Sequence, residues 1–215
     1  FIFNFVTAPI IPLIEASPHA KLTTLTLTEG FFSELKISLI AALVLSMPMI
    51  LVQFWKFVAP GLYRSERRYL VGFVFFATLL FLSGASFAYY LVFPLGFKFF
   101  IGISSNFGMN IDLSFGWYIG FVVKLVMAFG IVFEMPVVIF FLAKIGLVTP
   151  EMLKKYRKFA IIGIFVLAAV ITPPDIISQL MMAAPMLILY EISIWIAKVF
   201  GRKAEVAQEG ADIYE

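Results

Sequence analysis

Two glutamates occupy positions where a carboxylate has a chemical use. Glu134 lies in the apolar stretch AFGIVFEMPVV, and Glu66 stands among three arginines in WKFVAPGLYRSERRYL, residues 55–70. An acid within an apolar segment is costly and is usually retained for a function. A carboxylate in a loop can bind a guanidinium through two parallel hydrogen bonds. The setting of Glu134 therefore indicates a buried polar site. The setting of Glu66 indicates a site for an arginine of another molecule.

Each glutamate also has a structural interpretation, which the sequence leaves open. Glu134 would then make one hydrogen bond to another helix, and Glu66 would form a surface salt bridge in a loop that its arginines hold at the membrane surface. Lys124 is a poor partner for Glu134, because ten residues of helix span about 15 Å. Ser178 and Gln179 are better candidates if their helix packs against that of Glu134.

The remaining residue types exclude most enzyme chemistry. The sequence has no Cys and a single His, His19, so thiol catalysis and a two-histidine zinc motif are both impossible. It contains no phosphate-binding G-x-x-x-x-G-K-[ST] motif and no G-x-S-x-G motif. Ser83 in LSGAS has no His near it, and close packing of small residues is the simpler explanation. We therefore expect neither an enzyme nor a bound metal or cofactor.

Composition and charge spacing predict the elements that position these residues. Hydrophobic residues make up 62% of the chain and charged residues 13%, whereas soluble domains carry about 25% charged residues. Five apolar windows are bounded by charged or turn-forming residues: 37–55, 69–97, 113–143, 159–172 and 176–197. Only Lys124 and Glu134 interrupt the third window, and Pro136 is expected to bend its helix. We predict an all-α fold, a polytopic transmembrane helical bundle with five spans.

The fourth window is unusually short. About 14 residues make about 21 Å of helix, against about 30 Å of hydrocarbon. Pro173-Pro174-Asp175 joins it to the fifth window, which predicts a short hairpin of two spans. We expect its outer turn to lie below the other outer segments, with water and lipid headgroups dipping toward it. The alternative is that the helix continues through Tyr156 and regains the missing length.

Basic residues fall mostly on one side of these spans. That side receives 12 of the 16 Lys and Arg residues: Lys56, Arg64, Arg67, Arg68, Lys144, Lys154, Lys155, Arg157, Lys158, Lys198, Arg202 and Lys203. The opposite side receives Lys21, Lys36 and Lys98. An excess of Lys and Arg marks the cytoplasmic side, so we expect a multi-pass protein with a cytoplasmic C-terminus.

The domain organisation follows from these segments. We expect one transmembrane helical domain over residues 1–200, with structured outer segments at about 1–35 and 98–112, and a disordered tail over 201–215. Residues 1–14 are apolar and could complete an earlier span of a longer protein. The aromatic, amphipathic stretch 97–115 is expected to lie at the outer interface.

Three segments together resemble the TatC subunit of the twin-arginine protein translocase. They are FVAPGLYRSERR, MAFGIVFEMPV, and TPPDIISQ followed by LYEISI, and they occur in family order and at family spacing between about residue 7 and residue 200. The resemblance implies six spans in the complete protein, with both termini cytoplasmic, in the cytoplasmic (inner) membrane. It also implies a receptor for folded proteins whose signal peptides carry consecutive arginines, driven by the proton-motive force.

The resemblance further implies two sites and a set of partners. The signal-peptide site comprises Glu66 with Phe57, Pro60, Leu62, Tyr63, Arg67 and Arg68. Glu134, Asp175 and Gln179 match intramembrane and outer-turn polar residues of the family, and Ser178 joins them as a candidate partner of Glu134. Expected partners are twin-arginine signal peptides, single-span subunits of the TatA and TatB type, the lipid bilayer and other copies of the chain, but no nucleic acid.

Two other classes of function remain open from the residues alone. One is a proton-coupled small-molecule transporter with Glu134 as the proton carrier, and the other is a structural membrane scaffold. A transporter requires a midplane cavity with polar groups from several spans, and the spans offer few such groups. Capture of twin-arginine but not twin-lysine signal peptides would separate the receptor from the transporter.

Overall fold

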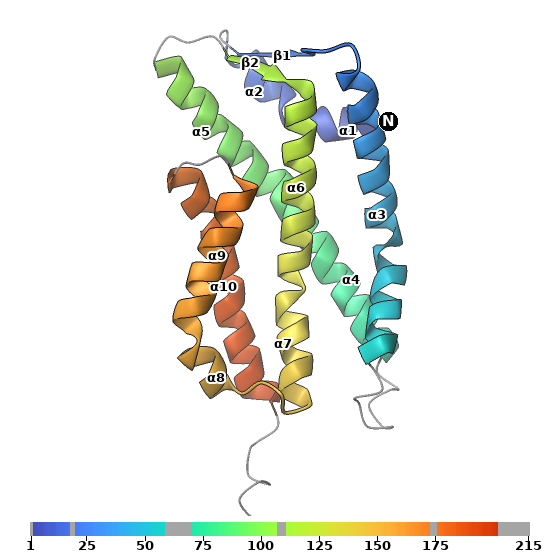
Figure 1. The fold of residues 1–215 in the computed structure, drawn as a ribbon, viewed down its shortest axis with the longest axis vertical. Coiled ribbons are helices and arrows are strands. Elements are labelled where there is room, and N and C mark those ends of the chain that lie inside the picture. The colour runs from blue at the N-terminus through green and yellow to red at the C-terminus, as the bar shows by residue number, and fades with distance from the viewer. Residues whose placement is uncertain (1, 18–19, 59–69, 107–110, 173–175, 202–215) are drawn as a thin grey trace, which may run out of the picture.

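The apolar windows fold into long helices that run along the longest dimension of the molecule (Figure 1). The computed structural model describes residues 2–17, 20–58, 70–106, 111–172 and 176–201. In chain order the elements are α1 (Ile2–Thr7), α2 (Ile11–Glu15), β1 (Ala20–Thr23), α3 (Glu29–Val58), α4 (Leu70–Phe87), the π-helical turn η3 (Ala88–Val92), α5 (Phe93–Asn106), β2 (Ile111–Ser114), α6 (Phe115–Phe133), α7 (Met135–Lys144), α8 (Pro150–Lys155), α9 (Arg157–Ile171) and α10 (Ile176–Phe200).

Within these described ranges, four helical stretches are long and apolar enough to cross a membrane. They are Glu29–Lys56, Gly72–Ile103, Phe115–Lys144 and Ile176–Phe200. The remaining predicted window forms α9, which has 15 residues and packs against α10. The predicted polytopic helical bundle is confirmed.

Helix α9 has 15 residues and meets α8 at Tyr156. Tyr156 separates α8 from α9 with φ −91° and ψ 6°, outside the helical range. In Figure 1 the outer ends of α9 and α10 lie well below the level of β1 and β2. The Tyr156 amide donates to the Met152 carbonyl at 3.0 Å and the Ala160 amide donates to the Tyr156 carbonyl at 3.1 Å. The helical path therefore continues through Tyr156, as the alternative expected, but with a kink between α8 and α9.

Two predicted boundaries are wrong, for one physical reason. Helix α3 begins at Glu29, eight residues before the charge-free window at 37, and α5 continues to Asn106. Residues 98–106 of the expected outer segment are thus helical and continue α5. A charge-free window gives only the apolar part of a helix, and the polar turns at its ends carry charges into water.

The second long helical path changes its pitch before Pro94. The Phe93 amide donates to the Ala88 carbonyl, five residues back, which defines the π-helical turn. Proline has no amide hydrogen, and its ring crowds the carbonyl four residues earlier. A widened turn before the proline relieves this conflict without ending the helix.

The helix ends at the top of Figure 1 are tied together by contacts between residues that are distant in sequence. Strands β1 and β2 pair in parallel, with Ala20 opposite Ile111, a pair that the all-α prediction did not include. The Glu29 carboxylate accepts hydrogen bonds from the Leu25 amide at 2.6 Å, from the Gly116 amide at 2.5 Å and from the Ser114 hydroxyl. One side chain thus caps α3 and joins it to the start of α6.

Two tyrosines hold the C-terminal end of α1. The Tyr118 hydroxyl donates to the Val6 carbonyl at 2.6 Å, and the Tyr89 hydroxyl donates to the Phe5 carbonyl. The last carbonyls of a helix lack the usual α-helical partner. The Tyr118 hydroxyl supplies a donor for the Val6 carbonyl, and the Tyr89 hydroxyl adds a second donor to the Phe5 carbonyl, which also accepts from the Ala8 amide at 3.4 Å. The N-terminal segment is thereby fixed to both α6 and the π-helical turn.

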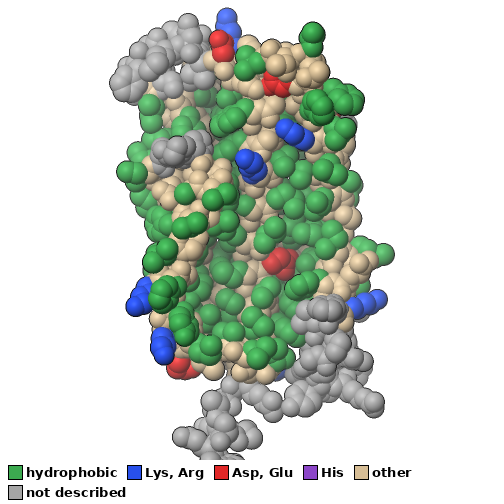
Figure 2. Space-filling model, in the orientation of Figure 1, with side chains coloured by type: hydrophobic (Ala, Val, Ile, Leu, Met, Phe, Trp, Pro, Cys, Tyr) green, Lys and Arg blue, Asp and Glu red, His purple; other side chains and the backbone are tan. Residues whose placement is uncertain are grey.

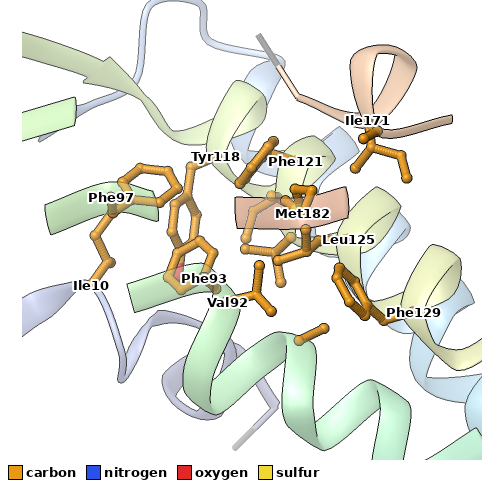
Figure 3. Packing of buried hydrophobic residues seen from close by; sticks show 14 of the residues in the cluster. Ile10, Val92, Phe93, Phe97, Tyr118, Phe121, Leu125, Phe129, Ile171 and Met182 are labelled. Atoms are coloured by element: carbon orange, nitrogen blue, oxygen red, sulfur yellow. The ribbon is translucent and has the colours of Figure 1, made fainter. Parts of the chain in front are cut away.

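Helix α6 lies at the centre of the packing (Figure 3). Its side chains Tyr118, Leu125 and Phe129 are fully buried, and they belong to a cluster that includes residues of α5, α9 and α10. Gly130 of α6 lies against the ring of Phe81 in α4. In a lipid bilayer the hydrophobic effect contributes little to the association of helices. Close van der Waals packing at small residues such as Gly130 therefore holds α4 against α6.

Candidate functional site

Pro136 interrupts the helical path at Glu134, as the sequence predicted. The Glu134 amide donates to the Ile131 carbonyl at 3.1 Å, and the Val137 amide donates to the Glu134 carbonyl at 3.0 Å. These bonds join residues three apart, so the turn is tighter than an α-helix. The break leaves Glu134 between α6 and α7, as the last residue before the second helix.

The Glu134 carboxyl group is buried without a partner. The side chain is 8% exposed, and neither of its oxygens has a hydrogen-bond partner among the described residues. A buried, unsatisfied carboxyl group is unfavourable. It can be stabilised by taking up a proton, or by a donor from a molecule that enters this site.

The predicted pairing of Glu134 with Gln179 is wrong. The Gln179 side-chain amide donates to the Phe165 carbonyl at 2.9 Å, so it joins α10 to α9 inside the hairpin. Met182 of α10 shares a hydrophobic cluster with Leu125 of α6 (Figure 3). Gln179 therefore lies about 4.5 Å above this level and Glu134 about 13.5 Å below it, at 1.5 Å per residue.

The second candidate, Ser178, is buried in the first turn of α10. It lies one residue further from the level of Glu134 than Gln179 does. The sequence could not give this offset, because it depends on how far the short hairpin slides along α6. The structure thus separates Glu134 from both of the candidate residues, Ser178 and Gln179.

Three aromatic rings fix the two helix ends from which the arginine-rich loop departs. Trp55, near the end of α3, is 2% exposed. Its ring meets Phe73 of α4 edge-on at 4.5 Å and Phe141 of α7 at 5.2 Å between centroids. Such edge-to-face pairs stabilise beyond their buried area. The clamp holds the bases of the loop against α7, the helix that begins after Glu134.

Sequence reasoning missed this clamp. Trp55 and Phe73 flank residues 59–69 on either side, and an aromatic residue on each arm of a helical hairpin is a usable signal for contact across it. Phe141 could not have been added from sequence, because it comes from a helix about 70 residues further along.

Most of the predicted signal-peptide site lies outside the described residues. This holds for Pro60, Leu62, Tyr63, Glu66, Arg67 and Arg68, and also for Asp175 at the outer turn. The backbone of Phe57 belongs to the last turn of α3, but its side chain is not described.

Several basic residues of the described ranges lie at the lower end of the bundle in Figure 1. Lys56, Lys144, Lys154 and Lys198 end helices or lie in α8 at the lower end in Figure 1. At this end Arg157 also forms a salt bridge with Glu191, between α9 and α10. Within the described ranges, no group of three or more His, Asp and Glu residues lies close enough to hold a metal ion.

The long apolar helices define a multi-pass α-helical membrane protein, and comparison with known proteins gives its family. Residues 1–185 match the family model described as TatC, Sec-independent protein translocase protein. The chain belongs to the TatC family.

Individual relatives agree with this assignment. The chain is 46% identical over 210 residues to a Sec-independent protein translocase protein TatC of Desulforapulum autotrophicum, covering 98% of this chain and 77% of the relative. It is 44% identical over 199 residues to that of Campylobacter jejuni, covering 92% and 80%. A solved structure described as a twin arginine translocase receptor, TatC, superposes with a TM-score of 0.83 at 44% identity, covering 94% of this chain and 87% of that one. The chain is thus a translocase component and not an enzyme.

Proposed function

We propose that this chain is the receptor and assembly scaffold of a twin-arginine translocase in the cytoplasmic membrane. Its loop 59–69 binds the consecutive arginines of signal peptides, and Glu134 receives a single-span partner subunit of the TatA or TatB type. The lower end in Figure 1, with the Lys-rich helix ends, faces the cytoplasm. On this proposal the chain hydrolyses no nucleotide during the export of folded proteins.

The observation that carries the assembly role is the unpartnered carboxyl group of Glu134. A buried acid with no hydrogen-bond donor in its own chain is incomplete. A membrane-embedded partner that brings a hydroxyl, amide or ammonium group would satisfy it. The bond would be worth about 1.5–3 kcal/mol if either group is charged, which corresponds to at least a tenfold difference in affinity.

This role is tested by capture of the partner subunits. A photo-cross-linker at Phe133, next to Glu134, should link to a TatA-type or TatB-type subunit in membranes, and Glu134→Ala should reduce the yield at least tenfold. Glu34→Ala, which removes an exposed carboxylate from α3, is the matched control and should leave the yield unchanged. Normal capture and normal export by Glu134→Ala would refute the proposal.

Glu134→Gln separates two forms of the role. The amide keeps a hydrogen-bonding group of the same size but carries no charge and exchanges no proton. Retained capture and export would mean that hydrogen bonding is enough. Loss of both would mean that charge or proton exchange at Glu134 is required.

The signal-peptide role rests on the Glu66 motif and on the clamp beneath it. Since Trp55 holds α3 against α4 and α7, the loop between them starts and ends at fixed points, which reduces the entropy lost when a peptide binds. A carboxylate at Glu66 can then bind the guanidinium of an incoming arginine in two-point geometry. Lysine cannot form this pair, so twin-lysine peptides should bind more weakly.

Binding of a labelled twin-arginine peptide to the translocase tests this second role. Glu66→Ala should weaken binding, and the difference from the unmodified chain should be largest at low ionic strength, where the carboxylate–guanidinium attraction that is lost is least screened. Glu151→Ala, in the exposed α8 at the same end of the bundle, is the control. Equal affinities of Glu66→Ala and Glu151→Ala would leave Glu66 with only a role in anchoring the loop.

A proton-coupled transporter is not favoured by the described residues. Such a protein needs several polar groups around a central cavity. Among the residues that the structure describes, the buried polar ones are Thr7, Ser33, Glu134, Thr172, Ser178 and Ser193. They are spread along the bundle, and none is a hydrogen-bond partner of Glu134.

A further inference from the structure

Three lysines lie on one exposed face of the segment formed by α8 and the start of α9. Lys154 and Lys155 end α8, Lys158 lies in the first turn of α9, and all three side chains are exposed. Backbone hydrogen bonds continue through Tyr156, which joins the two helices, so residues three and four positions apart remain neighbours on the surface. Lys158 is therefore adjacent to both Lys154 and Lys155, and one face presents three ammonium groups.

The opposite face of the same segment packs on α10. The Tyr190 hydroxyl donates to the Leu153 carbonyl at 2.9 Å, and Arg157, four residues after Leu153, forms the salt bridge with Glu191. Because residues 153 and 157 face α10, the three lysines point away from it. The salt bridge of Arg157 is the one that the described residues form, so none of their acids, Glu151 of α8 included, is a salt-bridge partner of these lysines.

The lysines lie at the level where the neighbouring spans end. Leu153 packs against Ala143 of α7 and Ala197 of α10, which immediately precede Lys144 and Lys198, the basic residues in the last turns of those helices. Basic residues at the ends of apolar spans lie among the headgroups, so α8 and the start of α9 lie at this membrane surface. Figure 2 shows Lys or Arg side chains beside hydrophobic ones at the lower left of the molecule, where Figure 1 places α8.

An apolar stripe continues from the lysines into the membrane. Four side chains at steps of three and four residues along α9 form it, and they are 58–73% exposed: Phe159, Ile162, Val166 and Val170. Lys155 precedes Phe159 by four residues, so the stripe begins at the lysines. A Cβ atom added to Gly163, on the same face, would meet no atom within 4 Å, so the surface is open there. The stripe is about 16.5 Å long at 1.5 Å per residue, close to half of the hydrocarbon thickness of about 30 Å.

Two exposed aromatic rings lie between the lysines and the stripe. The Lys155 Nζ atom lies 6.0 Å from the centre of the Tyr156 ring, and the Lys158 Nζ atom lies 5.2 Å from the centre of the Phe159 ring. Lysine stems that lie along apolar surface keep their ammonium groups at the headgroups, and tyrosine is enriched at the same level. A water-soluble acidic partner would meet the cations but leave the stripe uncovered, whereas a phospholipid meets both.

We propose that Lys154, Lys155 and Lys158 bind the headgroup phosphate of an anionic phospholipid in the leaflet at this end of the bundle, with an acyl chain along the α9 stripe. A lysine ammonium is a point charge on a flexible stem, so three of them can gather around one headgroup without a fixed geometry. On the orientation proposed above, this is the cytoplasmic leaflet. The site shares no residue with the loop 59–69 or with Glu134, so it stands whether or not the receptor function holds.

Native mass spectrometry of the purified protein with added lipid tests this site. The probes are phosphatidylglycerol, phosphatidylcholine with identical acyl chains, and inorganic phosphate. The triple variant Lys154→Gln/Lys155→Gln/Lys158→Gln should reduce phosphatidylglycerol retention more than tenfold, since one basic residue near an anionic surface contributes about fivefold. Arginine at the same three positions should keep the lipid. The matched control is Lys21→Gln/Lys36→Gln/Lys98→Gln, which removes the same charge from exposed positions at the opposite end of the bundle and should not change retention.

Three results would overturn the proposal. Equal phosphatidylglycerol retention by the two triple variants would mean that the lysines do not hold the lipid, and acids of the chain outside the described ranges could then neutralise them. Equal retention of phosphatidylcholine and phosphatidylglycerol by the unmodified chain would mean that the apolar stripe alone binds lipid. Binding of inorganic phosphate without a preference for phosphatidylglycerol would mean that the site takes a free anion. An unchanged melting temperature verifies folding of the triple variant, and Lys155→Gln alone, expected to lower retention about fivefold, repeats the test with one change.

Discussion

The contact between α4 and α6 gives a prediction whose sign and size follow from the coordinates. A Cβ atom added to Gly130 would lie 2.5 Å from Cε2 of Phe81 and within 3 Å of two more atoms of that ring. Ordinary contact begins at 3.4 Å, so the helices or the ring must move by about 0.9 Å. The ring is fully buried, so its movement must displace packed neighbours.

Gly130→Ala should therefore destabilise the protein. Overpacking costs about 1–3 kcal/mol, and replacing glycine by alanine in a helix returns about 0.4–1 kcal/mol. The net loss is about 1–2 kcal/mol, or about 2–8 °C in melting temperature for a chain of this size. Thermal unfolding of the purified protein in detergent, followed by intrinsic fluorescence, measures it.

The same helix supplies a control with the opposite expected sign. Gly120 has no atom within 4 Å of its added Cβ, so Gly120→Ala should raise the melting temperature slightly. Gly84→Ala should behave like Gly130→Ala or worse, because its Cβ would meet the backbone oxygen of Phe129 at 2.6 Å. Phe81→Leu should lessen the effect of Gly130→Ala. The clash is not the cause if Gly130→Ala and Gly120→Ala have the same melting temperature. It is also not the cause if adding Phe81→Leu does not reduce the loss of melting temperature that Gly130→Ala produces.

Three further predictions concern the outer end of the bundle. Tyr118→Phe should lower the free energy of unfolding by about 1 kcal/mol through loss of its bond to the α1 backbone, while Tyr90→Phe, whose ring is exposed, should not; equal melting curves would contradict this. Glu29→Ala should speed amide hydrogen exchange at the start of α6, and unchanged exchange would show that the strand pair alone holds this end. A spin label at Ile176 should report a depth below that of a label at Lys98 relative to the surrounding bilayer, with local thinning; equal depths would remove the basis for thinning.

Sequence patterns predicted the features that arise within one segment. Window length gave the helices and the short hairpin, and Pro136 gave the break at Glu134, because proline acts on its own turn. The motif segments gave the family. The same local reasoning set the start of α3 too late and ended the second span too early, because charges can lie in the polar ends of a helix.

Contacts between distant segments escaped prediction. The pairing of β1 with β2, the bridge from Glu29 to Gly116 and the Trp55–Phe141 contact join residues that are 85 or more positions apart. The pairing of Glu134 with Gln179 failed for the same reason. Both residues were correctly placed on membrane helices, but their relative depth is fixed by packing of the hairpin on α6.

The two proposed sites share one structural element, α7. Val137 and Phe141 of this helix pack against α3 and α4 beneath the loop 59–69, whereas Ile139 and Ala143 pack against α8 and α10. Glu134 precedes the first turn of α7, and the break there separates it from the fixed outer end. A shift of Trp55 on peptide binding would therefore act on α7, a short helix. Neither the Glu29 bridge nor the β1–β2 pair contacts α7. On the proposed function, the signal peptide and the membrane partner bias the position of the same ten residues. Measuring signal-peptide affinity in Glu134→Gln tests this directly, and an unchanged affinity in the presence of partner subunits would show that α7 does not connect the sites.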